Sequence, residues 1–316
     1  MSNNLKEHKL GPIFLLVLSG VLWGTSFPAI SFGLQYSSPE AFLLMRFLFA
    51  AIISTLLFPK AAKKALKRKE LVFIGSLNGI AYLFQFIGQQ WVPAGQSALL
   101  VNSYSVLVPF IAYFMVKEKI TYQKIFGAII GLIGVVLITN EGGEGIVQAE
   151  TKTEYYLGVL LVFGAGFVWA FYVVYTKLLE TGQKKEQSKN DEEFSAEDIL
   201  VASMYYTVII AFMSLIFTGQ NIFSSINIIS ISVAIYLAVF CSILPLIMYL
   251  HSLKKVDAGL STIILLIEVV VSFLISTLFL GENIVLKQII GGVLVITGVL
   301  IAMRETSKQL EQEQDS

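Results

Sequence analysis

Long apolar stretches, separated by short polar segments, recur along most of the chain. They fall at about 11–34, 40–59, 71–91, 95–116, 122–140, 155–178, 198–218, 229–250, 258–280 and 284–303. Each is close to the roughly 20 residues that a helix needs to cross the hydrocarbon core of a bilayer. None alternates like the strands of a transmembrane barrel, and a lipid-exposed backbone must satisfy its own hydrogen bonds. The pattern therefore predicts an all-α integral membrane protein with ten transmembrane helices.

Composition agrees with this prediction and removes several functional classes. Hydrophobic residues make up 56% of the chain and charged residues only 14%, against about 25% charged in soluble domains. One cysteine and two histidines are too few for an internal disulfide or a zinc motif, and no phosphate-binding G-x-x-x-x-G-K loop occurs. We therefore expect no metal and no cofactor.

The distribution of Lys and Arg predicts the orientation of the helices. Alternate loops on one side carry nearly all of these residues, including the basic run at 60–69, whereas the other side has only Lys152 and Lys287. Positive loops stay in the cytoplasm, so both termini are predicted to be cytoplasmic in a multi-pass protein of the cell membrane. The basic run lies between two spans and therefore indicates contact with anionic lipid, not with nucleic acid.

The second half of the sequence repeats the first. A shift of 164 positions aligns Ala94–Ser97 with Ala258–Ser261 and Gly134 with Gly298, whereas a shift of 146 aligns Gly20 and Trp23 with Gly166 and Trp169. The predicted segments are a tail (1–10), repeat 1 with five helices (11–140), an extracytoplasmic loop (141–154), repeat 2 with five helices (155–303), which contains a polar cytoplasmic linker at about 180–197, and a second tail (304–316).

An odd number of helices in each repeat gives the two repeats opposite orientations in the membrane. Inverted repeats that hold a solute between them near the midplane are a recurring plan of secondary transporters. The repeat therefore predicts alternating-access transport of a small solute, with the lipid bilayer as the surroundings and no nucleic-acid partner. The sequence does not predict an oligomeric state.

Several short motifs resemble one known family. They are Trp23-Gly24, Arg46-Phe47, Gly281-Glu282 and the glycine-rich span that ends at 298–301, in a doubled five-helix unit. Together they are similar to the EamA family of the drug/metabolite transporter superfamily over about residues 11–303. The resemblance implies a ten-helix carrier with cytoplasmic ends, often an exporter of amino acids or related metabolites. Family members commonly carry Glu-Pro in the ninth span, where this chain has Glu268 followed by Val269, with Tyr104 at the matching position of repeat 1.

Ionisable residues inside a bilayer are costly, so each is a candidate for function. Arg46 and Glu268 lie within predicted spans at comparable depth. They suit either a buried pair that stabilises the fold or a site for a zwitterionic solute, and Glu268 is also a candidate for proton coupling. Arg46 could instead reach the outer headgroups through its long side chain.

Polar and aromatic residues on other spans complete the candidate site. Those of the third span recur at spacings of four, three and four, which places them on one helical face, either lining a cavity or bonding neighbouring helices. Tryptophans at matching positions of the two repeats lie near mid-span, suited to solute stacking or to packing. The predicted solute-binding residues are Trp23, Arg46, Asn78, Tyr82, Gln85, Gln89, Asn102, Tyr104, Trp169, Tyr172, Tyr249 and Glu268.

Two other functional classes stay open at this stage. A channel or passive facilitator would need rings of like charge or a carbonyl filter, and neither is visible in the sequence. An intramembrane enzyme would need paired carboxylates or a nucleophile with a base. All four aspartates lie outside the predicted helix cores, so catalysis is the less favoured of the two.

Overall fold

The computed structural model of the chain describes residues 2–139, 149–180, 194–220, 226–281 and 286–301, except 288, 295 and 299. Helices and short turns account for these residues, among which no strand occurs. Eight helical segments are long and apolar enough to cross a membrane, and two shorter apolar helices are Tyr122–Gly134 and Ile289–Gly298. The predicted tail at 304–316, and most of the predicted loop and linker, lie outside the described residues.

The helices, in chain order, are α1 (Ser2–Gly33), α2 (Pro39–Leu57), α3 (Pro59–Ala65), α4 (Lys69–Gln89), α5 (Ala94–Asn102), the 3₁₀ helix η1 (Ser103–Val106), α6 (Val108–Val116), α7 (Tyr122–Thr139), α8 (Lys152–Glu180), α9 (Ala196–Thr218), α11 (Ile228–Ala238), the π-helical turn η3 (Val239–Ile243), α12 (Leu244–Leu253), α13 (Ala258–Leu265) and α14 (Ile267–Leu280). Since α1 begins at Ser2, most of the predicted N-terminal tail continues the first helix.

Local sequence signals set several helix ends. α9 begins with a capping box in which Ser195 and Asp198 satisfy each other's backbone N–H groups. α9 and α14 end at Gly219 and Gly281, whose φ angles of 65° and 71° are the left-handed conformation that closes a helix. Lys117 ends α6 with a φ of 55°, 164 positions before Gly281. The two turns therefore match across the sequence repeat.

Three of the long apolar segments are interrupted inside the span. η1 separates α5 from α6, and η3 separates α11 from α12. Pro109 and Pro245 lie in the first turns of α6 and α12, where each removes a backbone donor. α13 ends at Leu265 and α14 starts at Ile267 with no proline nearby. Irregular backbone at membrane depth is tolerated only where protein or a wet cavity surrounds it, so the breaks point to the protein interior.

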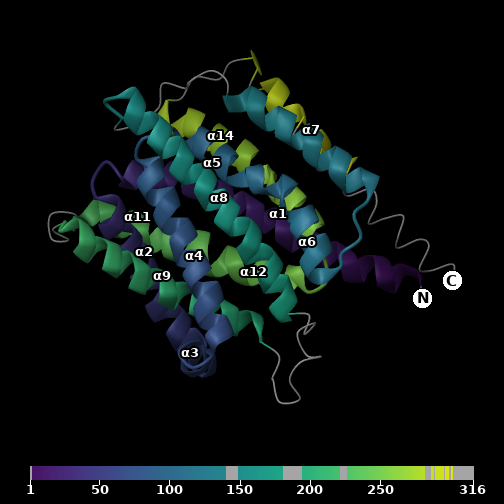
Figure 1. Cartoon of the computed structure of the whole chain (residues 1–316), viewed down its shortest axis with the longest axis horizontal. Coiled ribbons are helices and arrows are strands. Elements are labelled where there is room, and N and C mark those ends of the chain that lie inside the picture. The colour runs from purple at the N-terminus through teal and green to yellow at the C-terminus, as the bar shows by residue number, and fades with distance from the viewer. Residues whose placement is uncertain are drawn as a thin grey trace.

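The helices of the first half pack mainly on helices of the second half. α4 packs against α8 and α9, α2 against α9 and α11, and α1 against α12 and α14, while α5 and α6 pack against α8. Figure 1 shows α8 crossing in front of α5 and α14, with α2, α4, α9 and α11 on the other side of the molecule and α7 along one edge. The interior therefore lies between the two halves of the chain.

Glycines allow two of these helix contacts to be close, and the two contacts lie at corresponding places in the two halves of the chain. A Cβ added to Gly20 of α1 would lie 2.5 Å from the Ile267 side chain and 3.5 Å from that of Leu265. A Cβ added to Gly166 of α8 would lie 2.5 Å from the carbonyl oxygen of Val101. Gly166 is Gly20 shifted by 146, and Leu265 is Val101 shifted by 164. The same small residue thus meets the same place on the broken span in each half.

Glycines also allow close packing between α7 and the short helix Ile289–Gly298. A Cβ on Gly298 would lie 2.4 Å from the carbonyl oxygen of Gly127 and 2.8 Å from the backbone nitrogen of Gly131. Helix backbones approach this closely only where small residues face each other. α7 and the helix Ile289–Gly298 therefore form a tight pair.

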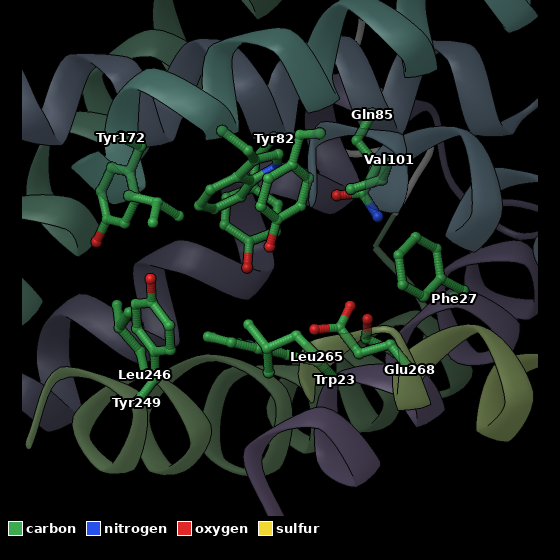
Figure 2. Close-up of a pocket in the computed structure, with 14 residues that line it drawn as sticks. Trp23, Phe27, Tyr82, Gln85, Val101, Tyr172, Leu246, Tyr249, Leu265 and Glu268 are labelled. Atoms are coloured by element: carbon green, nitrogen blue, oxygen red, sulfur yellow. The ribbon is translucent and has the colours of Figure 1, made fainter. Parts of the chain in front are cut away.

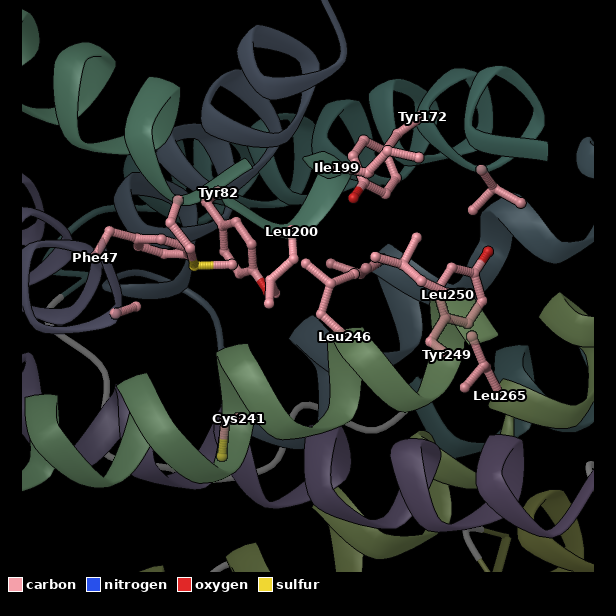
Figure 3. Packing of buried hydrophobic residues seen from close by; sticks show 14 of the residues in the cluster. Phe47, Tyr82, Tyr172, Ile199, Leu200, Cys241, Leu246, Tyr249, Leu250 and Leu265 are labelled. Atoms are coloured by element: carbon pink, nitrogen blue, oxygen red, sulfur yellow. The ribbon is translucent and has the colours of Figure 1, made fainter. Parts of the chain in front are cut away.

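Large apolar side chains cover the outside of the helix assembly. Phe114, Phe217 and Phe279 are 79%, 93% and 78% exposed. Soluble monomers rarely expose contiguous apolar surface of this kind, so the outer face suits lipid. Inside, one hydrophobic cluster connects the helices (Figure 3), with Phe47 and Tyr82 at one end and Tyr249 and Leu265 at the other.

Candidate solute-binding site

A cavity lies among α1, α4, α8, α12 and the broken spans α5–η1 and α13–α14. The volume open to the centres of water-sized spheres is about 50 Å³, several times the roughly 10–15 Å³ that one water molecule needs. Figure 2 shows two facing walls, with Tyr172, Tyr82 and Gln85 on one and Tyr249 and Leu246 on the other. The lining residues are Trp23, Ser26, Phe27, Tyr82, Gln85, Val101, Tyr104, Trp169, Tyr172, Val173, Leu246, Tyr249, Leu265 and Glu268.

These fourteen residues form seven pairs under the two shifts that align the sequence repeats. The shift of 146 relates three pairs and the shift of 164 relates the other four. The pairs are Trp23 and Trp169, Ser26 and Tyr172, Phe27 and Val173, Tyr82 and Leu246, Gln85 and Tyr249, Val101 and Leu265, and Tyr104 and Glu268. Every lining residue has a partner in the other half that also lines the cavity.

Glu268 is the carboxylate of this cavity. Its side chain is 6% exposed and projects into the space between the two walls (Figure 2). Among the described residues, the hydrogen bond that it receives comes from Asn102 Nδ2, which donates to Oε2 at 3.1 Å. Glu268 lies in the first turn of α14, where the partial positive charge of a helix N-terminus favours an anion. The break before α14 therefore places the carboxylate in the interior without a proline.

Aromatic rings form much of both walls. The ring centroids of Trp23 and Tyr249 are 5.4 Å apart, and those of Tyr82 and Trp169 are 5.0 Å apart at an interplanar angle of 87°. Trp169 also lies edge-on to Tyr172 at 5.2 Å. Such edge-to-face pairs are favourable for aromatic packing. The rings hold one another in place around the cavity.

Arg46 lies behind this wall and does not line the cavity. Its side chain is fully buried, and its Nε donates to Ser242 Oγ at 2.9 Å while Nη2 donates to the carbonyl oxygen of Cys241 at 2.8 Å. That carbonyl has no helical donor because Pro245, four residues later, lacks an N–H. The guanidinium lies 4.8 Å from the centroid of the Tyr82 ring. Arg46 therefore neither reaches the headgroups nor forms an ion pair with a described carboxylate.

The polar face of α4 divides between the cavity and neighbouring helices. Tyr82 and Gln85 line the cavity, which is one of the two roles that the sequence predicted for this face. Asn78 instead donates to Thr207 Oγ1 at 2.8 Å on α9, and Gln89 donates to the carbonyl oxygen of Phe27 at 2.6 Å on α1. The stripe thus has both of the predicted roles at different residues.

Eight of the twelve predicted residues line the cavity and four do not. Arg46, Asn78, Gln89 and Asn102 stabilise its surroundings. Six lining residues had no signal of their own because small or apolar side chains are common in every span. They are Ser26, Phe27, Val101, Val173, Leu246 and Leu265. Applying the repeat shifts to predicted residues could have identified some of them, since Tyr172 leads to Ser26 and Tyr82 to Leu246.

Charged residues at or near the ends of the spans hold the start of α13. Glu118 accepts hydrogen bonds from the backbone N–H groups of Ala258 at 2.8 Å and Gly259 at 3.3 Å. Asp257 pairs with Lys124 at 2.5 Å. Burial and, to a smaller extent, the neighbouring Asp257 carboxylate raise the pKa of Glu118 above its ordinary value. Within the described residues, no group of His, Cys, Asp and Glu could hold a metal ion.

Comparisons with known proteins agree with this arrangement. An uncharacterized transporter of Clostridium kluyveri is 28% identical over 315 residues, covering 95% of each chain. An uncharacterized transporter of Archaeoglobus fulgidus is 24% identical over 92% of this chain and 98% of its own. A solved crystal structure covers 92% of this chain and 96% of its own, with a TM-score of 0.69 and 15% identity, which shows a shared fold.

The sequence profile of one family matches two segments of the chain, residues 10–140 and 156–304, which together span most of its length. The predicted resemblance is therefore confirmed. This multi-pass membrane protein belongs to the EamA-like transporter family.

Proposed function

We propose that this protein is a secondary carrier, which binds a small polar organic solute in the central cavity and moves it by alternating access between two inverted five-helix repeats. One observation carries the proposal: the cavity is lined by seven pairs of residues related by the repeat shifts. A site on the symmetry axis between two repeats faces both halves equally, so relative movement of the halves can expose it to either side in turn.

Packing supports the same arrangement. The contact of α1 with α14 corresponds to that of α8 with α6, the contact of α1 with α13 to that of α8 with α5, and the contact of α1 with α12 to that of α8 with α4. The proposal takes the two shorter apolar helices of the described residues as spans in addition to the eight longer segments, which would place five spans in each repeat. With an odd number of spans the repeats have opposite orientations, which is the sense that the distribution of Lys and Arg favours.

The finer parts of the proposal rest on other arguments. Cytoplasmic termini and a cell-membrane location follow from the positive loops. Export as the direction, and small polar organic metabolites such as amino acids as the solutes, are what the family resemblance implies. Glu268 is the candidate for proton exchange because its carboxylate faces the cavity.

A counterflow measurement tests the carrier mechanism. Purified protein is reconstituted into vesicles that are preloaded with an unlabelled mixture of amino acids and amines, and uptake of the labelled mixture is followed. A carrier accumulates label transiently above equilibrium and saturates, because bound solutes exchange across the membrane. Flux that rises linearly with concentration, without counterflow, would instead identify a channel.

Two variants test whether the transported solute binds in the cavity or elsewhere in the protein. Trp169→Ala removes a lining ring and should abolish most of the counterflow. Glu70→Gln removes a carboxylate at the start of α4, where it lies 3.6 Å from Arg68 and away from the lining, and should retain it. Equal counterflow in both variants would place solute binding somewhere other than this cavity.

A further inference from the structure

We propose that the solute bound in the cavity is a small organic cation, an ammonium ion with an apolar body and no carboxylate of its own. This inference rests on the proposed function and narrows its substrate class. It follows from the charge, the aromatic surface and the donors of the lining residues.

The charge that the lining can carry is negative. Among the lining residues in the described part of the chain, Glu268 is the one with a carboxyl group, and tyrosine is neutral at pH 7. No described Lys, Arg or His forms an ion pair with it, and its hydrogen bond comes from the neutral amide of Asn102. A buried carboxylate without a counter-charge is costly. A bound cation would supply that charge.

Arg46 does not take this role. Its guanidinium donates to Cys241 and Ser242, and the rings of Phe47, Tyr82 and Phe86 lie within 5.7 Å of it. The Tyr82 ring lies between this cation and the solute space. Two nitrogens of Arg46, Nε and Nη2, are therefore engaged by the π-helical turn, and Nη1 is buried in a side chain that does not line the cavity.

Aromatic surface favours the same class of solute. Seven of the fourteen lining residues are aromatic, and they occur on both walls. The faces of such rings attract an ammonium ion within about 6 Å of the centroid. An anion would meet the negative ring faces with no cationic partner in the lining, so anions are disfavoured.

A zwitterion needs donors for its carboxylate, and those of the lining are neutral: the hydroxyls of the tyrosines and Ser26, the Gln85 amide and the Trp23 indole. Gln85 directs Nε2 toward Gln89 Oε1 at 3.4 Å. Trp23 Nε1 is buried without a hydrogen-bond partner and would give a single neutral donor. Carboxylates are ordinarily recognised by arginine or by several N–H groups together. The cavity therefore fits the amine of such a molecule better than its acid.

Three probes that share a four-carbon chain test this inference on the wild-type protein. Butylammonium is the cation, norvaline the matching zwitterion and pentanoate the matching anion. Each is added to the purified full-length chain in detergent at pH 7, and the thermal unfolding midpoint Tm is measured, because a ligand of the native state raises it.

Butylammonium should raise Tm with an apparent Kd about tenfold lower than that of norvaline, and pentanoate should have no effect. A norvaline effect equal to or stronger than that of butylammonium would overturn the inference in favour of a zwitterion. Stabilisation by pentanoate, or by none of the three probes, would also overturn it. The counterflow measurement with the mixed solutes does not depend on this result, so the carrier proposal can stand while the cation proposal fails.

A pair of variants then assigns the effect to the carboxylate. Glu268→Gln keeps the shape of the side chain and should weaken the butylammonium response about tenfold or more, since hydrogen bonds to charged groups are strong. Glu70→Gln should leave that response unchanged. A full response in Glu268→Gln would overturn the inference. Should Glu268→Gln fail to fold, the comparison of the three probes on the wild-type chain still decides the matter.

Discussion

At the scale of single residues, two buried charges have different roles. Arg46 has two donors engaged by the π-helical turn and three aromatic rings around its guanidinium. Glu268 has one hydrogen bond and faces a cavity. The first arrangement stabilises the fold and the second leaves a group available to a solute. Substitutions should therefore separate stability from binding.

Arg46→Ala should lower the free energy of unfolding by about 3 kcal/mol or more, because it leaves a buried carbonyl unpaired and opens a void among the rings. Arg46→Lys should also destabilise the protein, since a point charge cannot reproduce the fork that binds Cys241 and Ser242. Tm in detergent measures both effects, with Arg68→Ala as the control at a partly exposed arginine between two spans. A normal Tm combined with lost counterflow would place Arg46 in the solute site.

The sequence predicted these two residues as functional candidates, but it could not separate their roles. Hydrophobicity reveals that a charge lies within a span, whereas its partners depend on which helices meet. Asn78 and Gln89 illustrate the same limit: their spacing predicted one face correctly, and the structure then directs that face toward α9 and α1 at its two ends. The breaks in the spans also position Glu268, and the break before α14 has no proline that would have revealed it.

At the scale of helices, the start of α13 depends on residues from other elements. Asp257 precedes this helix without capping it and pairs with Lys124 of α7, while Glu118 after α6 accepts the first N–H groups. The loop that joins α12 to α13 is further held by Lys177 of α8, which donates to the carbonyl oxygens of Leu253 and Val256. The short connection between α12 and α13 is thus held by α7, by α8 and by the segment that follows α6.

Protonation of Glu118 should affect the stability of this connection. Its pKa is higher in the folded state than in the unfolded chain, so the native protein binds the proton more tightly. The stabilisation from this proton is fully present below the unfolded pKa and is lost as pH rises through the folded pKa. Glu118→Gln does not ionise, and its Tm relative to wild type should therefore rise as pH increases from about 4 to 8.

The same series with Glu70→Gln gives the control for loss of a carboxylate that is only partly buried. The opposite result would be a Tm of Glu118→Gln, relative to wild type, that falls as pH increases. It would mean that the hydrogen bonds from the two backbone N–H groups stabilise the ionised carboxylate more than burial and Asp257 destabilise it. The direction in which the relative Tm changes with pH therefore decides between the two possibilities.

At the scale of the whole molecule, the pairing of lining residues predicts that the carboxylate of Glu268 can be replaced by one at the corresponding position of the other half. Tyr104 occupies the position that corresponds to Glu268 in the other half. Adding Tyr104→Glu to Glu268→Gln should recover part of the butylammonium response, because the new carboxylate would enter the same cavity from the opposite side. The recovery should be incomplete, since Leu266 stands where Asn102 would have its counterpart.

The Tm response to butylammonium measures this recovery, and Glu268→Gln combined with Val173→Glu provides the control. That variant also adds an acid to the lining, but at a position unrelated to Glu268. Equal recovery in the two double variants would show that position does not matter. No recovery with Tyr104→Glu, in a protein that folds, would count against equivalent halves.

The pairing also bears on how much of the molecule could be predicted. Span positions and the repeat followed directly from apolar length and glycine spacing, and the family followed from short motifs. The cavity itself did not, because six of its lining residues resemble ordinary membrane-facing residues in composition. Correspondence with a predicted residue in the other half identifies Ser26 and Leu246, whereas Phe27 pairs with Val173 and Val101 with Leu265, none of which was predicted.

The glycine contacts lead to a last consequence. Gly20 against Leu265 and Gly166 against Val101 are contacts at corresponding places, so exchanging the conformations of the two proposed repeats would exchange these two contacts. The difference in free energy between the inward-facing and outward-facing conformations would then come from the positions where paired residues differ. Examples are Ser26 with Tyr172 and Tyr104 with Glu268. In such a protein a few mismatched pairs, and whatever solute or proton they hold, would govern which side of the membrane the empty carrier faces.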